Sequence, residues 1–252
     1  MDAILIDNLT KRYGEHIAVE ELNLRVRPGE ALGFLGPNGA GKSTTINVLL
    51  DYVRPTTGTV QVLGYDAQTR TQAIHERIGV LPDGYSLYDR LTGREHIELA
   101  AQLKHTNVNV GAVCDRIGLD AADADRLAGA YSKGMCQRLA LGMALVGDPE
   151  LLILDEPTSG LDPHGVSRIK NVIETELDRG TTVFFSSHVL NHVESVCDRV
   201  AILDDGQLVA VDSIEGLREA IGSEALTLEE LFAAYTNETD HQQVTPQEVS
   251  VE

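Results

Sequence analysis

The sequence has no tryptophan and few lysines. Its 252 residues include 20 Lys and Arg against 39 Asp and Glu, which gives a formal net charge of −19. The lysines are Lys11, Lys42, Lys104, Lys133 and Lys170. Because an acidic surface repels phosphate backbones, we expect no nucleic-acid partner. The same balance is typical of halophilic proteins, since dissolved ions screen the self-repulsion. An acidic docking face for a basic partner is the alternative.

Long apolar runs are also missing. No stretch approaches the roughly 18 apolar residues that a membrane-spanning helix needs, and residues 1–3 lack the positive charge that begins a signal peptide. We therefore expect a soluble chain that would reach a membrane only through partners. The three cysteines (Cys114, Cys136 and Cys197) are scattered and odd in number, which favours reduced thiols in the cytosol over a disulfide framework.

A glycine-rich loop, residues 36–44, is the most informative feature that is present. It lies between an apolar run (31–35) and a helical pattern (45–50), the strand–loop–helix context of a P-loop. Glycines let successive backbone N–H groups turn toward an anion at a helix N-terminus. We expect Lys42 to reach the β- and γ-phosphates of a nucleoside triphosphate and Ser43 to hold Mg²⁺. The predicted nucleotide-binding residues of the loop are Gly36, Pro37, Asn38, Gly39, Ala40, Gly41, Lys42, Ser43 and Thr44.

Two adjacent carboxylates follow a second apolar run. Residues 151–154 have the pattern of a buried strand, and Asp155 and Glu156 stand at its C-terminal end. Beside a P-loop, Asp155 would bind Mg²⁺ directly or through water, and Glu156 would polarise the water that attacks the γ-phosphate. His188 follows the next predicted strand, where it would hydrogen-bond the γ-phosphate or the water, or else serve a structural role.

The order of these motifs resembles that of the ATP-binding subunit of ABC transporters. The matching motifs are residues 36–44, Asp155 with Glu156, residues 159–162, and His188. The resemblance extends over residues 3–235 and implies ATP and Mg²⁺ as cofactors. It favours a catalytic role for His188 beside Glu156 and Lys42. It also places Asp162 among the nucleotide-binding residues.

One more family motif is expected in the helical part of the chain, and residues 131–135 (YSKGM) stand at its position. The family pattern is LSGGQ, so only Ser132 and Gly134 match. A hydroxyl and glycine N–H groups at a helix start make an anion site; the alternative is an ordinary capped helix start. In the family this motif contacts the γ-phosphate held by the other subunit, so two copies sandwich ATP. The form with Lys133 and Met135 looks like variants common in ABC-2-type exporters.

Two further positions follow from the resemblance. Tyr13 matches the aromatic residue that stacks on adenine, with a strand-edge tyrosine as the alternative. Asp83 occupies the place of a Gln or Glu that approaches Mg²⁺ and links the site to the membrane partner. Aspartate is shorter than glutamate, so direct ligation by Asp83 stays open, and we expect Asp83→Glu to preserve ATPase activity. The expected metal ligands are Ser43, Asp155 and Asp83.

The expected fold class is α/β: a P-loop (RecA-like) core with an N-terminal antiparallel β region and an inserted helical subdomain. Strands are predicted at 3–9, 17–26, 31–35, 59–63, 78–81, 151–154 and 181–186, with a hairpin at 200–211. Helices are predicted at 45–50, 68–77, 92–103, 108–117, 132–146, 163–177, 189–196, 214–221 and 226–234. We expect one ABC ATPase domain over residues 1–235, with a helical subdomain at about 86–147 and short C-terminal helices at 213–235. We expect residues 236–252 to be a disordered polar tail.

The resemblance implies an ATPase subunit whose ATP-driven dimerisation powers transport through separate transmembrane permease subunits. The ABC-2-like motif favours export, and the chain would lie in the cytoplasm on the inner face of the membrane. Two alternatives stay open: a soluble ABC ATPase without a transporter, and another P-loop NTPase such as a GTPase or kinase. A soluble ABC ATPase usually has two ATPase units in one chain or long coiled coils, and this sequence has one unit and no sustained heptads. A GTPase would carry a guanine-binding motif, which is missing from the sequence, and neither a GTPase nor a kinase has a use for residues 131–135.

Overall fold

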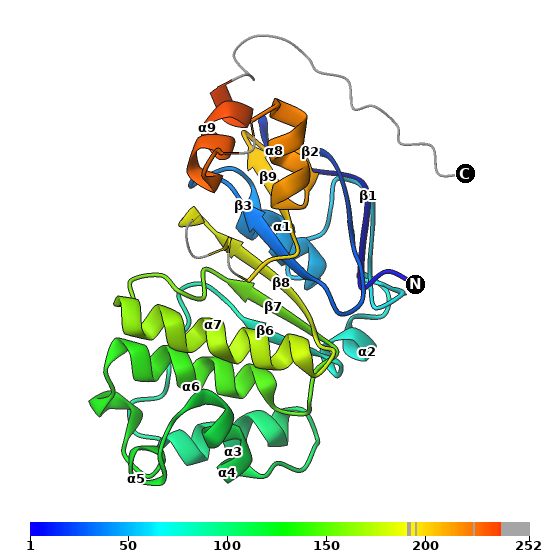
Figure 1. The fold of residues 1–252 in the computed structure, drawn as a ribbon. Coiled ribbons are helices and arrows are strands. Elements are labelled where there is room, and N and C mark those ends of the chain that lie inside the picture. The colour runs from blue at the N-terminus through cyan, green and yellow to red at the C-terminus, as the bar shows by residue number, and fades with distance from the viewer. Residues whose placement is uncertain (191–192, 195, 224, 238–252) are drawn as a thin grey trace.

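A six-stranded sheet forms the centre of the computed structural model, which describes residues 1–190, 193–194, 196–223 and 225–237 (Figure 1). Its strands lie in the order β10 (Gln207–Asp212), β9 (Arg199–Asp204), β3 (Ala31–Leu35), β8 (Thr182–Ser187), β7 (Leu151–Asp155) and β6 (Ile78–Leu81). Neighbouring strands are parallel except in the β9–β10 hairpin. Strands β3, β7 and β8 are buried along their whole length, as expected for parallel strands covered on both faces.

A second sheet, entirely antiparallel, is formed mainly by the N-terminal part of the chain. Its strands lie in the order β2 (His16–Val26), β1 (Ile4–Tyr13), β4 (Thr57–Val62) and β5 (Tyr65–Asp66). Helices α1 (Lys42–Leu49) and α2 (Thr71–His75) connect this region to the central sheet. The expected antiparallel β region is therefore confirmed.

The central sheet separates two hydrophobic cores. Along β7, Leu151 and Ile153 pack into the core shared with the antiparallel sheet and α1, whereas Leu152 and Leu154 pack into the core shared with the helices. This alternation follows from the two-residue period of a strand. It holds β7 between two packed layers, so the residues that follow its C-terminal end have a defined position.

Helices cover the other face of the central sheet. Those of the helical region are α3 (Gly93–Leu103), α4 (Val110–Ile117), α5 (Ala121–Ala124), the 3₁₀ turn η1 (Ala128–Ala130) and α6 (Lys133–Leu145). They lie together at the bottom of Figure 1, next to α7 (Pro163–Asp178), while α8 (Ile214–Ile221) and α9 (Leu228–Asn237) lie at the opposite end of the molecule. A capping box between Thr92 and Glu95 starts α3, close to the predicted helix start at 92.

The predicted elements occur with shifted ends, and three short ones were not predicted. Strand β1 continues to Tyr13, beyond the predicted end at residue 9. The alternating pattern stops early because Asn8, at φ 48°, lies at a bulge within the strand. Helix α1 begins at Lys42, three residues before the predicted start at 45. Elements β5, α5 and η1 are too short to show a period. The predicted helix at 189–196 lies partly outside the described residues. Residues 238–252 of the predicted tail lie wholly outside them.

Candidate nucleotide-binding and catalytic site

The P-loop connects β3 to α1 and is shaped by its glycines. Gly41 is the N-cap of α1 at φ 102°, and Gly39 has φ 90°, backbone conformations that side chains other than glycine rarely adopt. A Cβ atom on Gly36 would lie 2.6 Å from a carbonyl oxygen of β9, and one on Gly41 would lie 2.5 Å from a carbonyl oxygen of β2. The loop is therefore packed against both sheets on one side, while nothing lies within 4 Å of the Cβ position of Gly39.

Lys42, the first residue of α1, folds back over this loop. Its Nζ donates hydrogen bonds to the carbonyl oxygens of Gly36 (2.7 Å) and Pro37 (3.2 Å) and lies 3.7 Å from Oε1 of Glu156. The lysine side chain is only 6% exposed. The ammonium group is thus already largely desolvated and oriented at the start of a helix, where phosphate oxygens bind in P-loop proteins.

Asp155 is the last residue of β7 and is buried. Ser186, its register partner on β8, donates a hydrogen bond from Oγ to Asp155 Oδ1 and accepts one from the backbone N–H of Glu156 at 3.0 Å. Burial raises the pKa of Asp155, hydrogen bonds with Ser186 and Ser43 oppose that rise, and the nearby carboxylates of Asp83 and Glu156 add to it. A buried carboxylate of this kind is stabilised when a cation binds beside it.

Glu156 lies at the turn that follows β7, with φ 51°. Its Oε2 is 2.8 Å from Nδ1 of His188 and also accepts a hydrogen bond from the His188 backbone N–H at 3.4 Å. Since its Oε1 lies near Lys42 Nζ, the structure brings together all three residues predicted to be catalytic. The carboxylate is held between the Lys42 ammonium at the start of α1 and the His188 ring after β8.

The predicted magnesium ligands supply oxygen atoms, which Mg²⁺ prefers. The Ser43 hydroxyl lies close enough to Asp155 to lower the pKa of that carboxyl, against the effect of its burial. Asp83 is exposed in the loop after β6 and lines, with Asp155 and Glu156, a pocket of about 420 Å³. Within the described residues no group of three or more His, Cys, Asp or Glu side chains could hold a metal ion. A magnesium site here would therefore need the Ser43 hydroxyl and oxygens of water or phosphate as well.

Ser132 and Gly134, the two residues that match the LSGGQ motif, lie at the start of α6 and not at the P-loop. Ser132 is the N-cap of α6, and its Oγ accepts a hydrogen bond from the Met135 backbone N–H at 3.3 Å. Nothing lies within 4 Å of the Cβ position of Gly134. In the part of the chain that the structure describes, neither residue hydrogen-bonds to its own P-loop. Lys133, in contrast, lines the pocket that contains Asp155.

Two other predicted nucleotide contacts, Tyr13 and Asp162, have local partners of their own. The Tyr13 side chain at the end of β1 is 48% exposed, with Lys11 Nζ 4.7 Å from its ring centroid. Asp162 is the N-cap of α7, and its carboxylate accepts a hydrogen bond from the Gly165 backbone N–H at 2.7 Å. Helix capping explains this aspartate, so its contact with nucleotide stays a prediction.

The structure also adds residues that the sequence did not single out. Ser186 hydrogen-bonds to both Asp155 and Glu156. Its position at the end of a strand parallel to β7 is a signal from which the sequence could have identified it. Gln137 is buried in α6, where its Nε2 donates to the Pro157 carbonyl (2.8 Å) and its Oε1 accepts from the Tyr85 hydroxyl (2.9 Å). Burial raises the pKa of Tyr85, which keeps its hydroxyl a donor.

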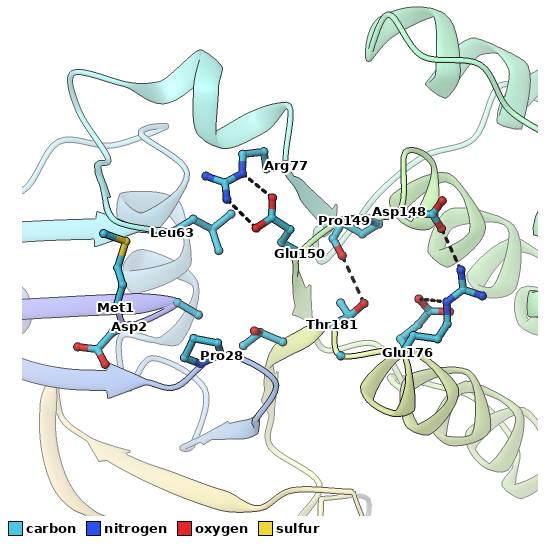
Figure 2. Close-up of a pocket in the computed structure, with 14 residues that line it drawn as sticks. Met1, Asp2, Pro28, Leu63, Arg77, Asp148, Pro149, Glu150, Glu176 and Thr181 are labelled. Atoms are coloured by element: carbon cyan, nitrogen blue, oxygen red, sulfur yellow. Dashed lines mark hydrogen bonds and ion pairs between the residues drawn. The ribbon is translucent and has the colours of Figure 1, made fainter.

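A second hollow, of about 410 Å³, lies at the opposite edge of the central sheet, where β6, β7 and β8 begin. Figure 2 shows Arg77 and Glu150 facing each other there, with Asp148 and Glu176 on the far side. Arg77 and Glu150 form two hydrogen bonds of 2.5 and 2.6 Å. Ligands of open parallel sheets bind beyond the carboxyl ends of the strands, which is the edge that carries the P-loop.

The parallel sheet, the P-loop after β3 and the carboxylates after β7 define a P-loop nucleoside triphosphatase. Within that class, residues 19–159 match the family described as "ABC transporter". The chain belongs to this family and carries its ATP-binding domain. None of the helices in the described residues combines the length and hydrophobicity needed to cross a membrane.

Relatives with similar sequences include ATP-binding proteins of transporters. The chain is 42% identical over 214 residues to an uncharacterized ABC transporter ATP-binding protein of Nostoc sp., covering 82% of this chain and 62% of that relative. It is 40% identical over 205 residues to the bacitracin transport ATP-binding protein BcrA of Bacillus licheniformis, covering 80% and 67%. It is 36% identical over 231 residues to the daunorubicin/doxorubicin resistance ATP-binding protein DrrA of Streptomyces peucetius, covering 90% and 70%. The chain thus spans about two thirds of the length of these relatives.

Solved structures support the same assignment. An ATP-binding subunit of an ABC transporter superposes with a TM-score of 0.83 at 26% identity, covering 92% of this chain and 99% of that one. A dimeric ATP-binding cassette in a post-hydrolysis state, bound to ADP and Pi, superposes with a TM-score of 0.76 at 25% identity, covering 84% and 98%. The predicted fold class is confirmed, including its antiparallel β region and helical region.

Proposed function

We propose that this chain is the ATP-hydrolysing subunit of an ABC transporter, in which ATP-driven dimerisation powers export through separate permease subunits. The observation that carries the proposal is the cluster of Lys42, Glu156 and His188 at the P-loop. Oε1 of Glu156 lies 3.7 Å from Lys42 Nζ, and its Oε2 lies 2.8 Å from His188 Nδ1. A γ-phosphate and its attacking water would use all three groups, the lysine for the phosphate charge and the other two for the water.

The P-loop and its surroundings bind the nucleotide. The backbone N–H groups of residues 36–44 and the Lys42 ammonium hold the phosphates, and Tyr13 stacks on the adenine ring. Asp162, in the loop that precedes α7, also contacts the nucleotide. Ser43 and Asp155 would hold Mg²⁺, with Asp83 as a further oxygen donor, and the bound ion would shield the phosphate charge.

Glu156 is the general base of the hydrolysis. Its carboxylate accepts a proton from the attacking water, and the resulting hydroxide forms the new bond to the γ-phosphorus as the bond to the ADP leaving group breaks. His188 orients this carboxylate through its ring Nδ1 and lies where it can also donate to the γ-phosphate. The protein thus acts by positioning and by stabilising the charge that develops in the transition state.

A second copy of the chain completes the site. Ser132 and the N–H groups around Gly134, at the start of α6, contact the γ-phosphate bound to the P-loop of the partner. Hydrolysis removes this bridging phosphate and adds charge repulsion, so the dimer opens. The similarity to a dimeric cassette bound to ADP and Pi supports this arrangement.

The permease subunits bind near Asp83 and the helical region, so the chain lies on the cytoplasmic face of the membrane. Residues 1–235 form the ABC ATPase domain, with a helical subdomain at about 86–147 and short C-terminal helices at 213–235. Two similar proteins are named for bacitracin transport and for daunorubicin resistance, which supports the ABC-2 type and the outward direction.

The experiment that tests this function compares two carboxylate-to-amide changes. Glu156→Gln keeps nucleotide binding but lowers turnover by about 100-fold or more, and it accumulates as a dimer with Mg²⁺ and ATP in size-exclusion chromatography. Glu150→Gln, at the opposite edge, is the matched control and remains active. Adding Ser132→Ala to Glu156→Gln returns the protein to a monomer. Fast hydrolysis by Glu156→Gln, or a monomer under all conditions, contradicts the proposal.

The net charge of −19 supports a second proposal, that the protein is adapted to high salt. Concentrated ions screen the repulsion between its carboxylates, so the melting temperature should rise with KCl concentration up to molar levels. Full stability and activity at low ionic strength would contradict it.

A further inference from the structure

Gln137 is a polar residue buried in the otherwise apolar inner face of α6. It is 5% exposed, and the residues that follow it on the same helix, Leu139 and Leu141, are fully buried. Both ends of its amide are used: Nε2 donates to the Pro157 carbonyl at 2.8 Å, and Oε1 accepts from the Tyr85 hydroxyl at 2.9 Å. A buried polar group retained with both of its hydrogen bonds made specifies one arrangement of its neighbours.

The two partners of this amide belong to loops that carry predicted site residues. Pro157 directly follows Glu156, whose backbone is left-handed and whose N–H is held by a side-chain oxygen from β8. Tyr85 lies in the loop after β6, two residues beyond Asp83, and both line the pocket next to Glu156. Through Gln137, a helix of the helical region is therefore bonded to the turn that aims the Glu156 carboxylate.

A glutamine amide satisfies both partners at this position. The Pro157 carbonyl can only accept, and the Tyr85 hydroxyl donates, so the residue between them must offer a donor at one end and an acceptor at the other. A glutamate would place a carboxylate oxygen against the Pro157 carbonyl, and a leucine of similar size would leave two buried polar groups without partners. The chemistry selects an amide with this reach.

We propose that Gln137 is a positioning residue for hydrolysis, which sets the backbone beside Glu156 and links it to the loop that carries Asp83 and Tyr85. This inference rests on the proposed function of Glu156 as general base. Movement of the Tyr85 loop reaches the Glu156 turn through two consecutive hydrogen bonds. Gln137 affects how the base is aligned, and the phosphate-binding groups of the P-loop do not depend on it.

The test measures ATP hydrolysis and nucleotide affinity for Gln137→Leu, Tyr85→Phe and the double variant. Misalignment of a catalytic group by a fraction of an ångström lowers kcat, so we expect Gln137→Leu to lose about 10- to 100-fold in kcat, with KM and ATP affinity within about twofold of wild type. Tyr85→Phe, which removes a single oxygen and preserves the shape of the ring, shows a smaller loss of the same kind. Because the pair acts through one chain of bonds, the double variant matches Gln137→Leu alone.

Tyr88→Phe is the matched control, since Tyr88 lies in the same loop but its side chain is 64% exposed. It keeps wild-type kcat. A folded Gln137→Leu with wild-type kcat, a loss confined to KM, or additive effects of the two changes would overturn the inference. If Gln137→Leu does not fold, the kcat of Tyr85→Phe decides it. An inactive wild-type chain would instead refute the proposed function, so the two failures are distinguishable.

Discussion

The two edges of the central sheet treat their charged residues in opposite ways. At the edge where β6, β7 and β8 begin, Arg77 pairs with Glu150 through two hydrogen bonds, and this pairing lowers the pKa of Glu150. At the P-loop edge, burial raises the pKa of Asp155, and neighbouring carboxylates increase the effect. One edge stabilises its carboxylates with arginine, whereas at the other the buried lysine Lys42 lies 3.7 Å from Glu156 and the burial of Asp155 is not offset by an arginine in the described residues.

The difference shows which edge is organised for its own stability and which for a ligand. The hollow in Figure 2 contains cations and anions that neutralise each other, so a ligand would have to break existing ion pairs to bind there. The P-loop edge has an excess of carboxylates, a lysine held only by carbonyl oxygens and one longer ion pair, and glycine N–H groups at a helix start. A bound cation such as Mg²⁺ would supply the positive charge that this edge lacks.

The comparison would be broken if removing a cation had the same effect at both edges. We expect Lys42→Met to lower ATP affinity or turnover by about 100-fold or more, because no other buried cation lies at the P-loop in the described residues. Arg77→Met should leave hydrolysis unchanged and lower the free energy of unfolding by about 1 kcal/mol or less, as exposed ion pairs do. Nucleotide titration, steady-state hydrolysis and chemical unfolding check both variants. Equal losses of activity would contradict the contrast.

A smaller effect is expected from Ser186→Ala, which removes one oxygen at the end of β8. The change removes the hydrogen bond to Asp155 and the one from the Glu156 N–H. Because both carboxylates would then be less well aligned with the nucleotide, kcat should fall by about tenfold. The free energy of unfolding should fall by about 1–3 kcal/mol. Ser167→Ala is the control, because this exposed serine donates to the Pro163 carbonyl within its own helix α7, away from both carboxylates. Wild-type kcat for Ser186→Ala would show that the serine serves packing alone.

Asp155→Asn should separate stability from function. Folding raises the pKa of Asp155, so the folded chain takes up this proton more readily than the unfolded chain, and its stability falls as pH rises above about 4. Without Mg²⁺ or nucleotide, the amide variant should be about 1 kcal/mol more stable at neutral pH, although it loses Mg²⁺-dependent activity. Unfolding measured between pH 4 and 8 in the presence of a chelator checks this. A less stable variant would mean that the charged form is favoured by the fold.

The smallest effect is expected for Glu150→Gln. Its pKa is lowered in the folded chain, so its contribution to stability is present above pH of about 4.3 and is lost as pH falls through the lower folded value. Because the carboxylate is half exposed, the variant should lose less than about 1 kcal/mol at pH 7 and nothing at low pH. Thermal unfolding at both pH values checks the prediction. A constant difference across pH would assign the loss to packing instead.

The sequence predicts the P-loop edge well because its signals are local. Glycine spacing specifies the loop at 36–44, and apolar runs that end in Asp155 or before His188 specify strand ends. Carboxyl ends of parallel strands meet at one edge, so these residues could be placed together without coordinates.

What could not be predicted depends on contacts between distant segments. The Gln137 amide bonds to groups 20 and 52 positions away in the chain, and a single polar residue in a helical pattern does not indicate its partners. The bulge at Asn8 and the four-residue helix α5 are set by packing of neighbouring elements. The ion pairs at the opposite edge also join residues far apart, and their types alone do not distinguish them from ordinary surface charge.

Strand β3, which presents the P-loop, lies between β8 and β9, and the backbone N–H of Gly206 in the final hairpin hydrogen-bonds to the carbonyl of Ala40 within that loop. A ribosome therefore translates the phosphate-binding segment early but supplies both of its flanking strands much later. Until they emerge, β3 has unpaired edges and the nascent chain has no finished cradle for ATP. We therefore expect nucleotide to stabilise this protein only once its synthesis has passed the last hairpin.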